Sequence, residues 1–389
     1  MAGIYIHIPF CRKFCSYCNF YSVGRLSLRN NFVDALCEEI RQRREFFSRK
    51  ADITIETLYI GGGTPSVLEP QMLERIFSAL CENFNMEHLQ EFTIELNPND
   101  VTLEFASFLK KLGVNRVSMG IQSFDNSHLK WMNRRHDADQ AKEAFHILRT
   151  AGFSNISCDL IFGFPSLTRN SWENNIRSML ALHPEHISCY QMSVEPGTPL
   201  AASLGKVCDS CGNNVLAMPS QEECASQYSL LQGMLLQAGY QQYEISNFCL
   251  SGYHSRHNSS YWNSVPYLGL GPAAHSFSGE TGSGAFREWN VPVLQRYLRR
   301  YLCGEPSPVK EREVLSEKDM FNEMIMLGLR QAKGIAFEKL KAGRYYPDIE
   351  KDVQRLLSSG ALVLSDSFLR IPPEKLFVSD SIIRELFVV

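Results

Sequence analysis

The sequence of 389 residues contains no apolar run that approaches the roughly 20 residues needed to span a bilayer. Its first residues do not combine a charged segment with a following apolar stretch, so we expect no signal peptide. The twelve cysteines are expected to be reduced thiols, because disulfides persist mainly in oxidising compartments. These absences predict a cytoplasmic protein and leave peripheral association as the only form of membrane contact.

Blocks of like charge are also missing. The net charge is −3, and a cluster of basic residues within 41–50 is expected to form a solvated helix face. Nucleic-acid binding usually requires a basic patch or stripe, so we expect no nucleic-acid partner. The apolar fraction of 44% is ample for a sizeable core, and the length suggests two or three domains.

Three cysteines, Cys11, Cys15 and Cys18, follow the strand-like residues Ile4–Ile8 without a fourth cysteine nearby. Free cysteines usually pack as small buried hydrophobic residues, but the charged residues between these three indicate a polar loop. A structural zinc ion needs four ligands, of which His7 would be the fourth. A disulfide would leave one cysteine over. An iron–sulfur cube usually has four cysteine ligands, so a cube held by three leaves one iron open to a small molecule.

The spacing C-x3-C-x2-C after a strand resembles the radical S-adenosylmethionine (SAM) superfamily, for which this motif is specific. The resemblance implies a [4Fe–4S] cluster held by Cys11, Cys15 and Cys18, with the amino and carboxylate groups of SAM on the fourth iron. It also implies that an electron from the reduced cluster cleaves SAM to a 5′-deoxyadenosyl radical. A protein that cleaves SAM needs an electron donor such as flavodoxin or ferredoxin.

Short β-branched segments alternate with amphipathic helices over the first part of the chain. Six strand–helix units within about 230 residues predict a parallel α/β sheet or barrel, and eight would be needed for a complete TIM barrel. The resemblance implies a partial (βα)6 barrel with an open side, whose ligands gather at the carboxyl ends of the strands. The expected strands are Ile4–Ile8, Thr57–Ile60, Glu91–Leu96, Arg116–Met119, Ile156–Phe162 and Ile187–Ser193.

The expected division of the chain has three parts: a radical-SAM partial barrel at 1–240, a connecting region at 241–314 and a smaller C-terminal domain at 315–389. The pattern of apolar residues in the C-terminal part indicates helices followed by a two-stranded wing. Its expected helices are 321–333 and 348–359, and its expected strands lie at 361–364 and 368–371. We therefore expect an α+β domain of winged-helix-like form.

A loop rich in Gly, Asn, Ser and Pro is expected between Leu204 and Gln221. It contains Cys208 and Cys211 as a lone C-x2-C pair. A metal site of this type usually has a second pair, so we interpret these two as incidental thiols.

The segment Gly61-Gly62-Gly63-Thr64-Pro65 ends the second expected strand, and adjacent glycines let backbone approach a ligand closely. It resembles the superfamily segment that holds the methionine end of SAM, which implies SAM contacts at Gly62, Gly63 and Thr64. Glu95 ends the third strand on the same side of the sheet. The family motif assigns it to SAM, and the competing interpretation is a solvated strand-end acid.

Three further side chains are candidates for SAM binding. Gln122 follows the fourth strand, and Arg134 is a candidate cation for the SAM carboxylate. Asp159 lies inside an otherwise apolar strand, where a buried carboxylate is costly unless it has a partner. The resemblance also implies SAM contacts at Tyr5, Tyr17 and Ser193.

Nearly the whole chain resembles one branch of the superfamily, the oxygen-independent coproporphyrinogen III oxidases and the related HemW-type haem chaperones. The oxidases carry an additional cysteine where this chain has Phe20, and they begin with a long extension that this sequence lacks. The hexapeptide from His257 to Trp262 matches the HNxxYW signature of the chaperones. The resemblance thus implies a protein that binds haem and transfers it to acceptor haemoproteins. The alternative is an oxidase that decarboxylates coproporphyrinogen III.

We expect the haem ligand within residues 249–275, because this segment contains several side chains that are able to ligate haem iron. Trp262, Tyr267 and Phe277 could supply an apolar surface for the macrocycle. We prefer His257, because it belongs to the chaperone signature, although these residues could equally pack a domain junction or reach SAM. The ligand candidates are Cys249, His254, His257, Tyr261 and His275. The sequence leaves formation of a homodimer open.

Overall fold

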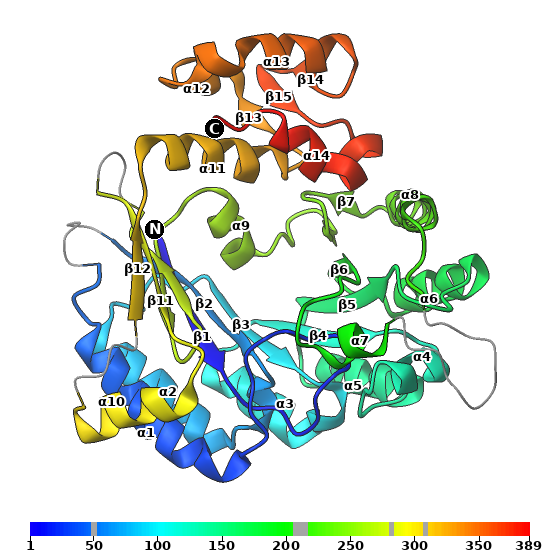
Figure 1. The fold of residues 1–389 in the computed structure, drawn as a ribbon. Helices are drawn as coiled ribbons and strands as arrows, with labels where there is room; N and C mark the ends of the chain where they lie inside the picture. The colour runs from blue at the N-terminus through cyan, green and yellow to red at the C-terminus, as the bar shows by residue number, and fades with distance from the viewer. Residues whose placement is uncertain (48–52, 205–216, 280–283, 306–309) are drawn as a thin grey trace.

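The computed structural model describes residues 1–47, 53–204, 217–279, 284–305 and 310–389. Most of the chain forms one large α/β body, and the C-terminal residues form a smaller unit that lies against one side of it (Figure 1). The pair Cys208 and Cys211 falls outside the described residues. Within the described part, no helix is both long and apolar enough to cross a membrane.

The large sheet is built around six parallel strands. They are β1 (Ala2–Ile8), β2 (Ile55–Gly62), β3 (Glu91–Leu96), β4 (Arg116–Gln122), β5 (Ile156–Phe162) and β6 (His186–Gln191). Each pairs with the next in chain order. All six predicted strands are therefore confirmed, and the parallel order is that of a partial (βα)6 barrel. The last strand ends at Gln191, so Ser193 lies just beyond it.

Shorter strands extend the sheet on both sides. Beyond β1 lie β9 (Tyr267–Leu270), which is parallel to it, and the antiparallel strands β10 (His275–Phe277), β11 (Phe286–Asn290) and β12 (Lys310–Val314). Beyond β6 lie the antiparallel strands β8 (Asn247–Cys249) and β7 (Gln241–Gln242). Much of the expected connecting region thus belongs to the sheet, which places β1 inside it with a partner on each side.

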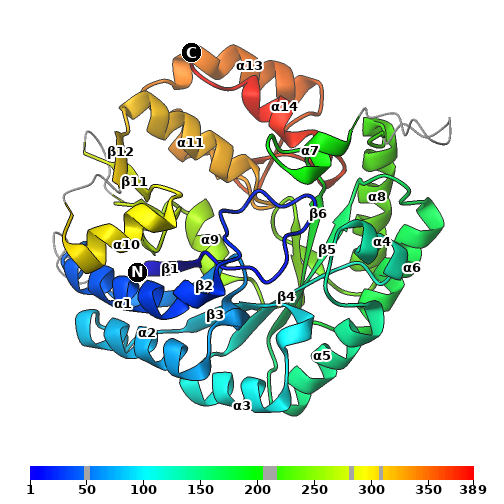
Figure 2. The ribbon, with the colours of Figure 1, turned by 60° about the horizontal axis from the view of Figure 1, so that its bottom comes forward.

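Helices cover the outer face of the curved sheet (Figure 2). They are α1 (Arg29–Gln42), α2 (Pro70–Asn83), α3 (Leu103–Leu112), α4 (Asn126–Trp131), α5 (Ala138–Thr150), α6 (Arg169–Leu182), α8 (Gln221–Gln237) and α10 (Leu294–Cys303). Two short helices lie elsewhere: α7 (Pro199–Ser203) follows the end of β6, and α9 (Arg256–Trp262) packs against β1 and β2. Local signals explain their ends. The Thr102 hydroxyl, for example, accepts from the Phe105 N–H at 3.1 Å and begins α3.

The two faces of the parallel strands differ in polarity. Apolar side chains such as Ile4, Leu58 and Ile94 alternate with polar ones and are fully or almost fully buried. The alternate residues of the paired strands, including Tyr5, Tyr59 and Glu95, project to the opposite face, because successive side chains of a strand point to opposite sides. With helices covering the outer face, this alternation gives the barrel a polar interior.

The C-terminal unit comprises the helices α11 (Glu317–Leu329), α12 (Phe337–Lys341), α13 (Tyr346–Ser358) and α14 (Ser379–Arg384) and the strands β13 (Ile335–Ala336), β14 (Val363–Ser365) and β15 (Phe368–Arg370). The expected two-stranded wing has a third strand, since β13 pairs with β15. Helix α11 begins four residues before the predicted start, because Ser316 and Asp319 form a capping box there. Hydrogen bonds such as Gln331 Nε2 to the Trp262 carbonyl, at 3.3 Å, join this unit to the barrel.

Within the basic segment 41–50, of which residues 48–50 lie outside the described part of the chain, Arg43 differs from the expectation. Arg43 is only 8% exposed and forms an ion pair with Glu288, which also accepts from Arg312 Nη2 at 2.8 Å. Part of the predicted solvated face is therefore an anchor between α1 and β11.

A second buried group lies close by on α1. Glu39 is 0% exposed, and its carboxylate accepts from the Gly271 N–H at 2.8 Å, Asn290 Nδ2 at 2.8 Å, and the hydroxyls of Tyr297 at 2.7 Å and Tyr301 at 3.1 Å. These donors come from the turn after β9, from β11 and from α10. One carboxylate thus joins the N-terminal helix to the flanking strands.

We expect Glu39→Ala to lower the free energy of unfolding by about 3 kcal/mol or more, because it leaves several buried donors without an acceptor. Urea unfolding followed by circular dichroism measures the change. Glu82→Ala, at an exposed position of α2, is the matched control and should change stability by less than about 0.5 kcal/mol. Equal effects of the two substitutions would contradict a structural role of the Glu39 network.

Candidate active site at the open end of the barrel

The loop that follows β1 crosses the open end of the barrel (Figure 2). Its two ends are held together by hydrogen bonds from the Cys11 N–H to the Val23 carbonyl, at 3.2 Å, and from the Val23 N–H to the Pro9 carbonyl, at 2.8 Å. Ser16, at the far side, donates its N–H to the Met132 carbonyl at 3.1 Å and accepts from the Leu200 N–H at 2.8 Å. The cysteine loop is thus anchored to opposite sides of the barrel mouth.

The three cysteines of this loop are partly or fully exposed. Partial burial raises the pKa of the Cys18 thiol to about 11, and the neighbouring Cys15 and Cys11 add to this effect. The side chains do not converge on one point: in the part of the chain that the structure describes, no group of three His, Cys, Asp or Glu side chains is placed to hold a metal ion. Cys11 and Cys15 are nevertheless close enough to Cys18 to influence its pKa.

Two donors already point at these sulfur atoms. Arg134 Nη1 lies 3.3 Å from the Cys15 Sγ, and the Thr64 hydroxyl lies 3.5 Å from the Cys11 Sγ. A nearby cation or hydrogen-bond donor favours the thiolate, which is the form that ligates iron. Three soft ligands with such donors fit an iron–sulfur cluster.

The glycines at the end of β2 allow the strand to meet the cysteine loop at close range. Gly63 donates its N–H to the Ile8 carbonyl at 2.8 Å, and a Cβ at this residue would lie 2.7 Å from the Phe10 carbonyl oxygen. Gly62 has a φ of +106°, which favours glycine, and it donates its N–H to Glu95 Oε2 at 3.1 Å. Gly62 and Gly63 therefore lie against the residues that lead into the cysteine loop, and Thr64 lies beside Cys11.

Glu95 is not a solvated strand-end acid. Its carboxylate accepts from the Tyr59 hydroxyl at 2.8 Å as well as from Gly62. Burial raises the pKa of Glu95 to about 7, and the nearby charge of Asp159 adds to this effect. The carboxylate is thus held in one orientation inside the barrel, where it can accept hydrogen bonds from a ligand.

Asp159 lies on the same polar face and has the partners that a buried carboxylate needs. Ser188 and Ser118 donate hydrogen bonds to it, and the charges of Arg116 and Arg134 favour its ionised form. Burial nonetheless raises the pKa of Asp159 to about 6. Sequence reasoning missed Arg116, which is 1% exposed and whose Nε has no hydrogen-bond partner. Its position inside an expected strand was the signal that could have identified Arg116 as a buried cation.

Gln122 ends β4, and Arg134, which follows α4, links the end of β4 to the cysteine loop. The pairing of β4 with β5 shifts register between Gly120 and Gln122, and Gln122 has a φ of +71°. Such a bulge redirects a side chain, and left-handed backbone at a non-glycine residue often marks a functional site. Arg134 Nη2 donates to the Gly120 carbonyl at 2.6 Å, while its Nε is buried without a partner. That free donor fits a guanidinium that still awaits an anionic ligand.

Of the remaining SAM candidates, two lie at the mouth of the barrel and the third, Ser193, does not. The Tyr5 hydroxyl lies 3.2 Å from His7 Nδ1 inside the barrel, and burial raises the Tyr5 pKa. Tyr17 lies on the cysteine loop near Arg134, and its pKa is raised chiefly by burial. Ser193 is exposed beyond the end of β6. Tyr5 and Tyr17 thus belong to the barrel mouth, whereas Ser193 lies at its margin.

His257 does not have the environment expected of a haem ligand. It is 1% exposed, its Nδ1 lies 2.8 Å from the Thr57 hydroxyl, and its Nε2 lies 2.8 Å from the Tyr261 hydroxyl. Burial lowers the His257 pKa to about 3, so the ring is neutral and both nitrogens are engaged. Its backbone N–H donates to Glu91 at 2.9 Å. As placed, His257 joins α9 to the sheet, and both of its ring nitrogens already have partners.

A cavity of about 710 Å³ lies next to the cysteine loop, between the sheet and α11. We call it the aromatic cavity. Its walls come from β1, the end of the cysteine loop, α9, β9, β10, β11 and α11. Its lining includes Tyr5, His7, Phe20, Tyr21, Tyr261, Tyr267, His275, Phe277, Arg287 and Met326.

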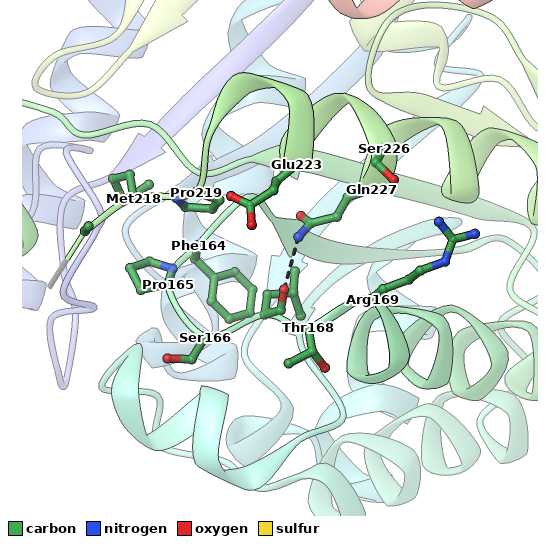
Figure 3. Close-up of a pocket in the computed structure, with 12 residues that line it drawn as sticks. Phe164, Pro165, Ser166, Thr168, Arg169, Met218, Pro219, Glu223, Ser226 and Gln227 are labelled. Carbon is green, nitrogen blue, oxygen red and sulfur yellow. Dashed lines mark hydrogen bonds between the residues drawn. The ribbon is translucent and has the colours of Figure 1, made fainter. Parts of the chain in front are cut away.

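Figure 3 shows a second cavity, of about 460 Å³, between the segment after β5 and the start of α8. Two of its polar side chains, Gln227 and Glu223, are already paired. Gln227 Nε2 donates to the Leu167 carbonyl at 3.1 Å, and Gln227 Oε1 accepts from the Gly163 N–H at 2.9 Å. Glu223 accepts from the Ser220 N–H at 2.7 Å. These groups hold the local structure together, so we assign this cavity no role in cofactor binding.

Comparison with known proteins identifies two family models in the chain. The Radical SAM superfamily matches residues 5–179, and the HemN C-terminal domain matches residues 315–378. Among solved structures, coproporphyrinogen III oxidase (HemN) from Escherichia coli superposes with a TM-score of 0.82 at 22% identity, covering 100% of this chain and 90% of that one. This likeness confirms the predicted fold.

Curated relatives are more similar in sequence. "Heme chaperone HemW" from Lactococcus lactis is 34% identical over 340 residues, which are 87% of this chain and 83% of that protein. The protein of the same name from Bacillus subtilis is 32% identical over 361 residues, or 91% of each chain. "Radical S-adenosyl methionine domain-containing protein 1, mitochondrial" from Bos taurus is 30% identical over 404 residues, covering 99% of this chain and 87% of that one.

We expect anaerobically reconstituted protein to hold about four irons per chain and Cys11→Ala, Cys15→Ala or Cys18→Ala to lose them, because the loop supplies three ligands without a spare. Iron analysis and the visible spectrum measure the cluster. Cys81→Ala, which removes an exposed cysteine on α2, is the control and should retain it. A normal cluster in Cys15→Ala would contradict the ligand assignment.

The raised pKa of Glu95 predicts a pH-dependent stability. Because the folded protein holds this proton up to about pH 7 whereas an unfolded carboxyl releases it near pH 4.5, stability is lost as pH rises between these values. Since one pKa unit corresponds to about 1.4 kcal/mol, Glu95→Gln should reduce the loss between pH 5 and 8 by about 1–3 kcal/mol. Urea unfolding of the cluster-free protein at both pH values measures it, with Glu82→Gln as the exposed control. Parallel pH profiles of parent and Glu95→Gln would contradict the assignment.

Proposed function

This chain belongs to the HemW family of haem chaperones, and on that premise we propose that it binds haem and delivers it to acceptor haemoproteins. The observation that carries the proposal is the identity of 32–34% to chaperones over 83–91% of their length. The alternative, a coproporphyrinogen III oxidase, is supported by a likeness of fold at 22% identity. Phe20, which stands where the oxidases have an additional cysteine, also favours the chaperone.

We propose that Cys11, Cys15 and Cys18 hold a [4Fe–4S] cluster and that SAM binds beside it. When bound, the cluster would supply an electron of low potential and an iron whose coordination SAM completes. The protein's part is to orient the cofactor. The free Nε of Arg134 would pair with the SAM carboxylate, and Glu95, fixed by Tyr59, would accept from hydroxyl groups.

The other cofactor contacts are proposals of the same kind. The Gly62–Thr64 segment would offer backbone to the methionine end of SAM, while Asp159 and Gln122 would supply polar contacts from the neighbouring strands. We include Tyr5 and Tyr17 and, at the margin, Ser193. His257 would act indirectly, by holding α9 and the Tyr261 hydroxyl against the barrel.

We further propose a three-part organisation with a barrel at 1–240, a connecting region at 241–314 and a C-terminal domain at 315–389. The acceptor would be a haemoprotein, and a flavodoxin or ferredoxin would supply electrons if SAM is cleaved. We place the chain in the cytoplasm, where its thiols would remain reduced. Sedimentation at several protein concentrations would decide whether it forms a homodimer.

We expect the reconstituted protein to bind about one haem per chain and to lose it to excess apomyoglobin, because a chaperone must release its cargo. The Soret spectrum follows both steps. With coproporphyrinogen III, SAM and dithionite, we expect no protoporphyrinogen beyond that formed by a Cys15→Ala control. Absence of haem binding, or catalytic formation of protoporphyrinogen, would contradict the proposed function.

A further inference from the structure

We propose that the aromatic cavity is the haem site and that His275 ligates the haem iron through a ring nitrogen. This inference rests on the proposed function, because it names the place and the contact by which the chain would hold its cargo. It replaces His257, the candidate that the sequence favoured, with a histidine from another strand.

The walls of the cavity suit a flat apolar ring. Tyr5 on β1, Phe20 on the cysteine loop, Tyr267 on β9 and Phe277 on β10 all contribute aromatic faces or edges. Phe20 is 66% exposed, so a ligand that covers it removes apolar surface from water. The volume of about 710 Å³ lies within the range of roughly 300–1,000 Å³ that is usual for small-molecule sites.

Among the other potential iron ligands in the cavity, His7 and Tyr261 already make hydrogen bonds within the protein. His7 is 4% exposed, its Nε2 lies 2.8 Å from the Tyr21 carbonyl oxygen, and its Nδ1 lies 3.2 Å from the Tyr5 hydroxyl. The Tyr261 hydroxyl lies 2.8 Å from His257 Nε2. Ligation through either residue would first require breaking a hydrogen bond within the protein.

His275 is available to a ligand. It is exposed at the cavity, and among the described residues its ring nitrogens make no hydrogen bond. Its ring stacks on Trp289, with centroids 5.5 Å apart, which fixes the ring plane while the nitrogens stay free. Partial burial and the charge of Arg287 lower the His275 pKa, so the imidazole is neutral near pH 7, the form that binds iron.

The cavity also contains a cation for the carboxylates of haem. Arg287 lines it and pairs with Glu323 on α11, with Arg287 Nη2 2.7 Å from Glu323 Oε2. A guanidinium fork binds carboxylates in pairs, so a haem propionate can compete with Glu323 for it. Since Glu323 belongs to the C-terminal unit, haem would be enclosed between that unit and the barrel.

The other sequence candidates lie elsewhere. Cys249 is 0% exposed within β8, which lies towards the opposite edge of the sheet from β10 in strand order. His254 packs against Tyr243, with ring centroids 4.7 Å apart. Of the three histidines in residues 249–275, His275 is the one that lines the cavity.

The test is a titration of reconstituted protein with haemin, monitored as a difference spectrum against haem-free protein. We expect His275→Ala to shift the Soret band and to weaken haem binding at least tenfold, and added imidazole to restore the parent spectrum by occupying the vacated position. His254→Ala is the matched control and should behave as the parent. Iron analysis before titration verifies that each variant retains its cluster.

The possible outcomes distinguish a wrong assignment of the haem ligand from a wrong assignment of the function. If the parent binds haem and His275→Ala binds it with unchanged spectrum and affinity, His275 is not the ligand. An equal loss in His254→Ala, or failure of imidazole to restore the spectrum, would also overturn the assignment. If the parent binds no haem, the proposed function itself fails. A second variant, Met326→Glu, tests the cavity, because a carboxylate there should weaken uptake, and unaffected binding would exclude this location.

Discussion

The arrangement of the site depends on the backbone contact between the end of β2 and the beginning of the cysteine loop. Gly63 donates its N–H to the Ile8 carbonyl, and its Cα approaches Phe10 so closely that a side chain would collide with backbone. Because β1 has a parallel partner on each side, its end cannot shift independently of the sheet. The contact therefore fixes where the cysteines, Thr64 and Glu95 meet.

A second constraint follows from the alternation of polar and apolar residues along the parallel strands. The buried carboxylates Glu95 and Asp159 face the barrel interior together with Arg116, and burial raises both carboxyl pKa values. Their ionisation is therefore less favourable than in water, and Arg116 offsets part of this cost for Asp159. The interior is therefore prepared for a polar cofactor, whereas the adjoining aromatic cavity, with its exposed Phe20, is suited to an apolar one.

Much of this was predictable from the sequence. The strand Glu91–Leu96 has its predicted bounds, because β-branched and aromatic residues lie between clear helix signals, and the glycines at 62 and 63 were placed beside the cysteines. The strands that flank the barrel were not predicted, since segments such as Gln241–Gln242 are too short to show alternation. Buried ion pairs such as Arg43 with Glu288 join residues 245 positions apart. The local sequence pattern around either residue therefore does not predict them.

The two histidines show where a sequence motif stops being informative. A signature identifies a residue on which the fold or the function depends, but it does not distinguish between these two kinds of dependence. His257 is stacked on Tyr59, which also holds Glu95, so its place in the signature is explained by the link it makes between α9 and the barrel interior. A ligand must instead keep a lone pair unengaged at the wall of a cavity. Only tertiary structure separates the two cases, and here it favours His275, which lies at the wall of the cavity.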